Sequence, residues 1–414
     1  MKERILLCKP RMSGRELEFI KPALAEDWAV PLGPDVTAFE QELGAFMGAD
    51  HVVALNSGTS AVHLALIACG VRPGDEVIVQ SLTFCASANP VTYLGATPVF
   101  VDSECATWNI DPDLLESTIK DRISKTGRKP KAIIPVALYG MPYQIDRIME
   151  IANRYDIPVI EDAAEGFGSK FNGRMLGTYG HFGVLSFNGN KMITTSGGGA
   201  LICPDAETAR KVMWYATQAR ESYPYYQHEE IGYNYRLSNI SACIGRAQLT
   251  VLDKYLAHHK HVQELYCELL RGVEGITMHC NPGAEYDANF WLCTAVLDPD
   301  LKIKGQENAY RRVISGSVGG AAGVTHAANS ATTDCQPNSN VEALRMALDA
   351  VNIETRPLWK PMHRQPVYKN APAYVNGASE SLFASGICLP AGPYVTDEDV
   401  RYIVNSVKST IDYR

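Results

Sequence analysis

The sequence predicts an α/β protein in which a mostly parallel sheet forms a large domain and a smaller α+β domain follows. Between about residues 50 and 205, short runs rich in β-branched residues alternate with helical patterns. Several runs are apolar throughout rather than at every second residue, as a sheet covered on both faces requires. The helical stretches between them supply the crossovers that parallel strands need.

Seven strands are expected in the first half of the chain. They are residues 51–56, 76–80, 97–102, 131–138, 158–164, 182–188 and 200–203. Ligands of such sheets bind beyond the carboxyl ends of the strands, so the chemistry should lie just after these runs.

The pattern changes after about residue 250. The elements expected there are a long helical stretch and two sparser strands, at residues 247–270, 290–297 and 353–359. Thr396 and Asp399 form a capping box that opens a last helix. We therefore place the large domain at 1–250 and the small α+β domain at 251–414. Residues 302–340 are predicted to be a loop insertion, because much of this stretch is rich in small polar residues without periodicity.

Composition and charge argue against several classes of protein. The 414 residues carry a net charge of -8, whereas sequence-independent nucleic-acid binding needs a cationic face. No stretch approaches the roughly 20 apolar residues that span a bilayer, and the N-terminus lacks a signal-peptide core, so we expect a cytoplasmic protein. The 11 cysteines include no C-x-x-C pair and are interpreted as reduced thiols.

A cluster of histidines deserves a separate interpretation. His258, His259 and His261 lie close together, as metal ligands can. No cysteine or carboxylate stands beside them at ligand spacing, so we interpret them as an exposed helix face. The sequence therefore predicts no metal site.

The first chemical signal follows the first strand. The segment Asn56-Ser57-Gly58-Thr59-Ser60 opens a helix with small residues. Such a start leaves backbone N–H groups free to hold an anion, which the helix dipole also favours. The segment is a candidate phosphate cradle, with a simple helix cap as the alternative.

Two further signals follow later strands. Asp162 and Glu165 end an apolar run, where a carboxylate can hold a protonated ring nitrogen or simply cap a helix. Lys191 follows the next run, and the glycines at 197–199 would let another backbone approach closely. A Schiff-base lysine must lose its proton to attack, which partial burial promotes. An anion cradle, a carboxylate and a lysine at the ends of strands match what pyridoxal 5'-phosphate (PLP) needs.

Longer segments carry a family resemblance. Those that match cover most of residues 10–300 and are NSGTSAVHLAL, QSLTFCASANPVTYLGATPVFVD, VIEDAAEGFGS, SFNGNKMITTSGGGAL and GYNYRLSNISACIGRAQL. With them the chain resembles the DegT/StrS sugar aminotransferases, PLP enzymes of fold type I, the aspartate aminotransferase-like fold with a seven-stranded sheet. The later segment RPLWKPMHRQPVY is similar to the branch that acts on UDP-linked 4-keto-6-deoxy N-acetylated sugars.

The resemblance implies roles for individual residues. Lys191 and Asp162 would be catalytic: the lysine binds PLP covalently and moves the proton, and the aspartate holds the pyridine nitrogen. Gly58, Thr59 and Ser186 would hold the phosphate, and Phe84 would stack on the ring. The implied contacts are completed by Glu165 near both cofactor and sugar, by Asn234 on the cofactor phosphate of a neighbouring subunit, and by Trp28, Arg356, Lys360 and His363 on the nucleotide-sugar. A homodimer with shared active sites would follow.

The resemblance also implies an activity. Glutamate would donate its amino group to C4 of a nucleotide-linked keto-sugar, with PLP and pyridoxamine 5'-phosphate alternating, for bacillosamine-type polysaccharide biosynthesis or protein glycosylation. Open alternatives are a dTDP-linked sugar, amination at C3, and a sugar dehydratase of the same family, members of which can lack the lysine. A binding protein without turnover is disfavoured by the intact Asp162 and Lys191 pair. No G-x-G-x-x-G joins a strand to a helix, which argues against a nicotinamide oxidoreductase.

Overall fold

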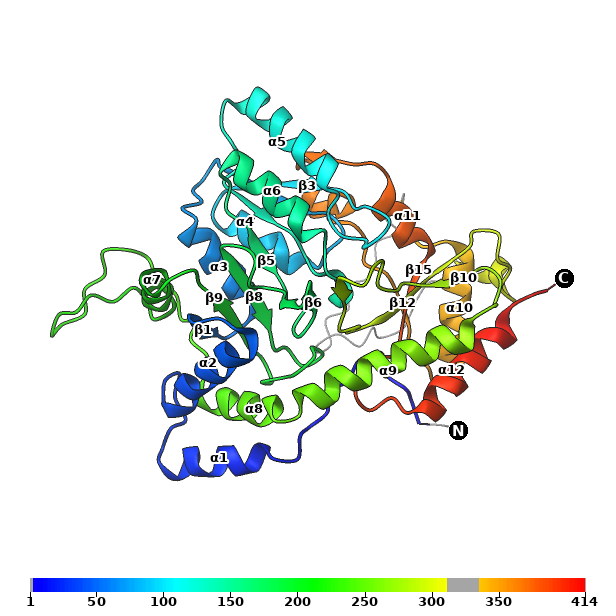
Figure 1. Ribbon diagram of the computed structural model, residues 1–414, viewed down its shortest axis with the longest axis horizontal. Helices are drawn as coiled ribbons and strands as arrows, with labels where there is room; N and C mark the ends of the chain where they lie inside the picture. Colours follow the sequence, from blue (N-terminus) through cyan, green and yellow to red (C-terminus); the bar gives the residue numbers. More distant parts are fainter. Residues whose placement is uncertain (1–2, 311–334, 414) are drawn as a thin grey trace.

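The seven strands expected from the sequence assemble into one sheet (Figure 1). This computed structural model describes residues 3–310 and 335–413. Two four-stranded sheets, ordered β1-β9-β8-β5 and β14-β3-β2-β4, join where β4 meets β5, through the bridges Ile133–Val159 and Val136–Asp162. The seven expected strands are all present, as β1 (Val52–Leu55), β2 (Glu76–Gln80), β3 (Thr97–Val101), β4 (Ala132–Ile134), β5 (Ile160–Asp162), β8 (Phe182–Ser186) and β9 (Gly199–Ile202).

The sheet is mostly parallel, which confirms the predicted fold class. β5 pairs parallel with β8, and β2 pairs parallel with β3 and β4, whereas β9 runs antiparallel to both β1 and β8. The short strand β14 (Ala373–Tyr374), from the C-terminal half, adds a further parallel pairing to β3. Val77 and Val79 of β2 enter one hydrophobic cluster and Ile78 enters another. The sheet is therefore covered on both faces, which explains its continuous apolar strands.

Helices flank this sheet and begin and end where their sequences favour it. They are α1 (Glu16–Ala25), α2 (Pro34–Met47), α3 (Gly58–Ala68), α4 (Asn89–Tyr93), α5 (Pro112–Thr126), α6 (Ile145–Tyr155), α7 (Ala206–Ala216) and α8 (Asn239–Leu249). In α5, the N-cap Asp111 accepts hydrogen bonds from the N–H groups of Asp113 and Leu114, and Gly127 ends the helix in the left-handed region. In α6, the buried Ile145 and Ile148 recur at helical spacing and face the sheet core.

The C-terminal part forms a second sheet, ordered β10-β12-β15-β13 and antiparallel at each pairing. The strands of this sheet are β10 (Ile276–Met278), β12 (Cys293–Leu297), β13 (Arg356–Pro357) and β15 (Gly386–Leu389). The helices of the C-terminal part are α9 (Leu252–Leu270), α10 (Ser339–Ala350), α11 (Ala378–Ser385) and α12 (Asp397–Thr410). A small sheet, β11-β6-β7, pairs Tyr286–Asp287, Lys170–Phe171 and Arg174–Met175. Thr396 and Asp399 form the predicted capping box of α12. The domain boundary near residue 250 stays a prediction, because Ile5 bridges to Ile353 and β14 joins the large sheet.

Two details differ from the sequence-based predictions, and one prediction falls largely on residues that the structure does not describe. The helical stretch 247–270 is two helices, because α8 ends at Leu249 and α9 begins at Leu252, with β-branched Thr250 and Val251 between them. His259 is buried, and its Nδ1 contacts the Phe290 carbonyl, so the exposed histidine face was wrong for this residue. Much of the predicted insertion at 302–340 lies outside the described residues.

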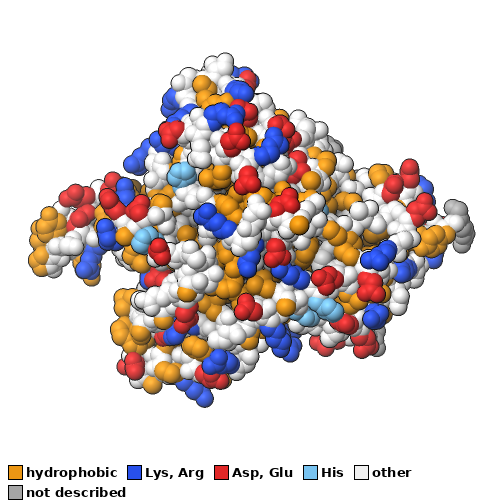
Figure 2. All heavy atoms as spheres, viewed as in Figure 1, with side chains coloured by type: hydrophobic (Ala, Val, Ile, Leu, Met, Phe, Trp, Pro, Cys, Tyr) orange, Lys and Arg blue, Asp and Glu red, His pale blue; other side chains and the backbone are white. Residues whose placement is uncertain are grey.

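Acidic and basic side chains are interspersed over the face shown in Figure 2, without a broad area of one sign. None of the helices in residues 3–310 and 335–413 is both long and apolar enough to cross a membrane.

Candidate active site

A cavity of about 420 Å³ opens where the sequence placed the chemistry, beyond the carboxyl ends of β1, β2, β5 and β8. Segments that follow these strands line it. They include Asn56, Ser57, Gly58 and Thr59 after β1, Thr83, Phe84 and Ser87 after β2, Asp162 and Glu165 at β5, and Ser186, Asn188, Asn190 and Lys191 at β8. Four strand ends that are far apart in sequence thus contribute to one cavity, as the parallel arrangement requires.

The anion cradle is the N-terminus of α3. Ser57 caps the helix, because its Oγ accepts a hydrogen bond from the Ser60 N–H at 3.0 Å. The N–H groups of Gly58 and Thr59 belong to the first turn, where no helical carbonyl is available to them. Gly58 packs closely on β8: a side-chain carbon added there would lie 3.1 Å from Ser186 Cβ. The free N–H groups and the helix dipole fit a phosphate at this end of the cavity.

Gly199 explains the glycine run predicted to allow a close approach. A side-chain carbon at Gly199 would lie 2.5 Å from the Gly58 nitrogen, so only glycine lets β9 pass the cradle. We expect Gly199→Ala to lower the free energy of unfolding by about 1–3 kcal/mol through overpacking. Urea unfolding tests this, with Gly189→Ala as the control, because a side-chain carbon there meets no atom within 4 Å. Equal stability of the two variants would contradict the close approach.

Asp162 ends β5 as a buried carboxylate that is 6% exposed. Ser87 Oγ donates a hydrogen bond to its Oδ2 at 2.6 Å, and the Ala164 N–H donates to Oδ1 at 3.2 Å. Burial raises the pKa of Asp162, against the opposing effects of these two hydrogen bonds and of the Lys191 charge. Within the described part of the chain no lysine, arginine or histidine forms an ion pair with it. A buried acid that lacks a contacting cation fits the protonated ring nitrogen of PLP.

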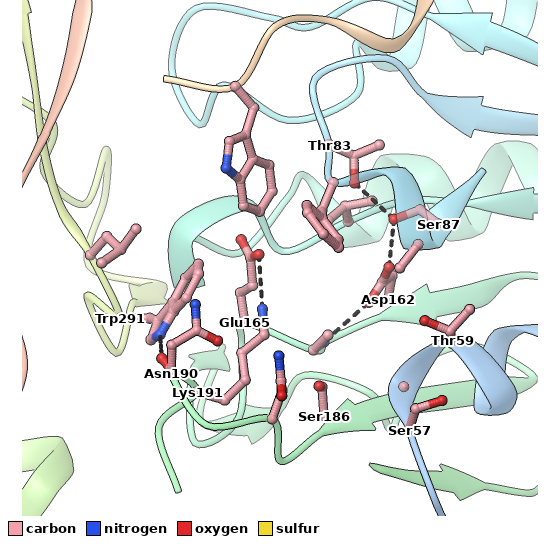
Figure 3. A pocket seen from close by; sticks show the side chains of 18 of the residues that line it. Ser57, Thr59, Thr83, Ser87, Asp162, Glu165, Ser186, Asn190, Lys191 and Trp291 are labelled. Carbon is pink, nitrogen blue, oxygen red and sulfur yellow. Dashed lines mark hydrogen bonds and ion pairs between the residues drawn. The ribbon is translucent and has the colours of Figure 1, made fainter. Parts of the chain in front are cut away.

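Lys191 extends from the loop after β8 toward the same space (Figure 3). Its Nζ donates to Glu165 Oε1 at 3.1 Å and lies 4.1 Å from the centre of the Trp291 ring. Glu165 is itself fixed, because the Tyr139 N–H donates to its Oε2 at 2.7 Å. Burial raises the pKa of Glu165, and the nearby Lys191 charge lowers it. The Glu165 carboxylate and the face of the Trp291 indole therefore hold the Lys191 Nζ at the wall of the cavity.

Other predicted site residues are divided between the cavity and its surroundings. Phe84 and Arg356 line the cavity, whereas Trp28, Asn234, Lys360 and His363 are not among its lining residues. His363 instead is held between Ser81 Oγ, 2.6 Å from Nδ1, and Glu380 Oε1, 3.1 Å from Nε2. The Asn234 side chain is exposed.

Several lining residues were not singled out from the sequence. They are Thr83, Ser87, Asn188, Asn190, Trp291 and Trp359. Thr83 and Ser87 stand in the family-like segment that also holds Phe84, so their hydroxyls were a visible signal. Trp291 was assigned to a strand, although it precedes β12 and its Nε1 donates to the Asn190 carbonyl at 2.6 Å.

This fold, with an anion cradle, a buried carboxylate and a lysine around one cavity, is that of a PLP-dependent aminotransferase. The chain matches the DegT/DnrJ/EryC1/StrS aminotransferase family over residues 10–307 and 319–408, and it belongs to that family. It is a PLP-dependent sugar aminotransferase.

Individual relatives are similar over nearly the whole chain. EpsN of Bacillus subtilis (strain 168), named as a pyridoxal phosphate-dependent aminotransferase, is 41% identical over 411 residues, covering 98% of this chain and 95% of EpsN. The GDP-perosamine synthase of Caulobacter vibrioides is 34% identical, covering 99% of this chain and 98% of its own. A crystal structure of a DegT DnrJ EryC1 StrS aminotransferase from Brucella abortus matches with a TM-score of 0.81 at 29% identity, covering 96% of this chain and 95% of that one.

Proposed function

We propose that the enzyme transfers the amino group of glutamate to C4 of a UDP-linked 4-keto-6-deoxy-N-acetylhexosamine, for bacillosamine-type glycan biosynthesis. This proposal is supported by one wall of the cavity, which is formed by the segment RPLWKPMHRQPVY that resembles the UDP-sugar branch. Arg356 and Trp359 of that segment line the cavity, and Arg356 pairs with Glu354 at 2.8 Å. Apart from Lys191, Arg356 is the only lysine or arginine among the lining residues that the structure describes, so it is suited to a nucleotide diphosphate.

The residues of the cavity have different roles toward the cofactor. When bound, PLP supplies an aldehyde carbon for amine exchange and a ring that withdraws electrons from the reacting carbon. Gly58, Thr59 and Ser186 would hold its phosphate, Asp162 would pair with its ring nitrogen, and Phe84 would contact the ring.

Lys191 moves the protons. Its Nζ takes a proton from Cα of glutamate in the first half of the reaction and returns one to C4 of the sugar in the second. Glu165 holds Nζ beside the cavity by the hydrogen bond described above. Because one cavity serves two substrates in turn, ping-pong kinetics are expected.

The test is to separate the two halves of the reaction. Enzyme loaded with PLP is mixed with glutamate, and 2-oxoglutarate is measured. UDP-, GDP- and dTDP-linked 4-keto-6-deoxy sugars are then added one at a time, and the product is identified by mass and NMR. We expect the UDP-linked N-acetyl sugar to react fastest and to gain an amine at C4. Preference for the GDP-linked sugar, an amine at C3, or loss of a hydroxyl without glutamate consumption would each overturn the assignment.

We also propose a homodimer in which Asn234 reaches the cofactor phosphate of the partner subunit. The segment between α7 and α8 projects far from the body of the molecule, at the left of Figure 1. It exposes large hydrophobic side chains, at Tyr223, Tyr225, Tyr226 and Ile231. A projection of this kind is suited to a partner surface, and a C2 dimer would use one such patch twice.

Mixing two inactive variants tests the shared site. We expect Lys191→Ala and Asn234→Asp proteins to regain about a quarter of wild-type activity together, if subunits pair at random. The added charge at Asn234 repels the phosphate it faces, and a mixed dimer gathers both lesions in one site while the other stays intact. Mass spectrometry of the intact dimers controls for subunit exchange. Exchange without recovered activity would count against a shared site.

A further inference from the structure

A pair of buried hydroxyls lies behind Asp162. Thr83 and Ser87 are 0% and 1% exposed, and their oxygens are 2.8 Å apart. Ser87 Oγ continues the chain to Asp162 Oδ2 at 2.6 Å, as Figure 3 shows. The three side chains thus form one line of hydrogen bonds along the cavity wall.

The charge on Asp162 fixes the direction of this line. An ionised carboxylate only accepts hydrogen bonds, so the Ser87 hydroxyl must donate its single proton to Oδ2. Thr83 then donates to Ser87, because no proton remains on Ser87 for the reverse arrangement. Both hydroxyls are therefore oriented toward a negative Asp162, and each strengthens the next.

This line acts against the effect of burial. Burial raises the pKa of Asp162, and the Ser87 hydrogen bond is the largest of the effects that lower it. A neutral acid could not pair with a protonated ring nitrogen, so the ionised form is the useful one. The two donors, Ser87 Oγ and the Ala164 N–H, each bind a different oxygen of Asp162. Each oxygen can therefore still accept a hydrogen bond from a group in the cavity.

The backbone ties this line to the ring contact. Ser87 ends a short 3₁₀ helix, Cys85–Ser87, and its N–H donates to the Phe84 carbonyl at 3.2 Å. One turn therefore carries both the aromatic side chain on the cavity wall and the hydroxyl that holds the carboxylate. We propose that Ser87, supported by Thr83, is a positioning residue that keeps Asp162 oriented and charged for the cofactor ring nitrogen. This proposal rests on the proposed role of Asp162 and is independent of the sugar substrate.

The test uses variants that remove one hydroxyl at a time. We expect Ser87→Ala to slow the glutamate half-reaction about 10- to 100-fold, the range for a lost hydrogen bond to a charged group. Thr83→Val should cause a smaller loss, and Thr83→Ser, which keeps the hydroxyl, should behave as wild type. If Ser87→Ala fails to fold, the Thr83 pair still decides the question.

Cofactor binding gives a readout that does not depend on turnover. The Kd of PLP is compared with that of an analogue whose ring nitrogen is replaced by CH. Ser87→Ala should weaken PLP about 10-fold or more and leave the analogue unchanged, because the analogue makes no contact that needs a charged Asp162. An equal loss for both cofactors would show a merely structural role and overturn the proposal.

A double-mutant cycle separates the proposal for Ser87 from the proposed role of Asp162. If Ser87 acts through Asp162, adding Ser87→Ala to Asp162→Asn should cause no further loss. Additive losses would overturn the Ser87 proposal while leaving Asp162 in its role. An unchanged half-reaction in Asp162→Asn alone would remove the role of Asp162, and the Ser87 proposal with it. None of these measurements uses a sugar, so failure of the UDP assignment is recorded separately.

Discussion

Replacing Lys191 with alanine should abolish transamination and the covalent bond between enzyme and cofactor. The side chain is 12% exposed and its Nζ contacts Glu165 and the Trp291 ring beside the cavity, where it can act as nucleophile and base. Losing a positioned general base typically slows a reaction about 10²- to 10⁴-fold, and losing the nucleophile adds to this. Steady-state turnover measures the first effect. Borohydride reduction followed by peptide mass spectrometry measures the second.

The control for this prediction is an exposed lysine away from the cavity. Lys254→Ala on α9 should keep both turnover and the reducible bond. Thermal unfolding of Lys191→Ala should show a folded protein, since Lys191 contributes to the cavity rather than to a hydrophobic cluster. Turnover above about a thousandth of wild type in Lys191→Ala would mean that another group carries the cofactor.

The sheet was predictable because strand burial leaves a direct mark on the sequence. Apolar runs gave all seven main strands, and the position of strand ends then placed Gly58, Asp162 and Lys191 at one cavity. The rule applies because parallel strands carry their carboxyl ends to one edge. β14 was not predictable in this way, since a two-residue strand leaves no pattern.

Side chains that reach the site from other directions were harder to predict. Trp291 stands before β12 and touches Lys191 only through tertiary folding. His259 shares a helix with the half-buried His258 and the exposed His261, and periodicity over a short cluster does not reveal that His259 faces the Phe290 carbonyl. The contact between His363 and the substrate stays a prediction from the resemblance, which does not fix the direction of the His363 side chain. In this structure Ser81 and Glu380 hold it.

Replacing Asp162 with asparagine is the second change from which we expect a large effect. The variant keeps the shape of the side chain but cannot balance a positive ring nitrogen. PLP should still bind through its phosphate at the α3 N-terminus, while proton removal from glutamate slows about 10²- to 10³-fold, the cost of one preorganised electrostatic contact. Single-turnover absorbance with glutamate measures this. An unchanged rate would mean that Asp162 only caps the turn that begins at Ala164.

The same variant should change how the cofactor-free protein responds to pH. Burial raises the pKa of Asp162 in the folded chain, so folding favours its protonated form. This stabilisation is complete below the ordinary range of an aspartate and is lost as pH rises through the raised pKa. Asparagine does not titrate, so the free energy of unfolding of wild type should fall relative to that of Asp162→Asn as pH increases. Urea unfolding of both proteins over a pH series checks the sign.

Binding of PLP should cancel this difference between the two proteins. A protonated ring nitrogen beside Asp162 would favour the ionised carboxylate and lower its pKa again, so the stability of loaded wild type should no longer fall relative to the variant. Parallel pH curves for the two cofactor-free proteins, or a persistent difference after loading, would contradict this account. If both expected results are obtained, Asp162 is an acid whose buried charge costs stability in the cofactor-free protein and is retained because the cofactor needs it.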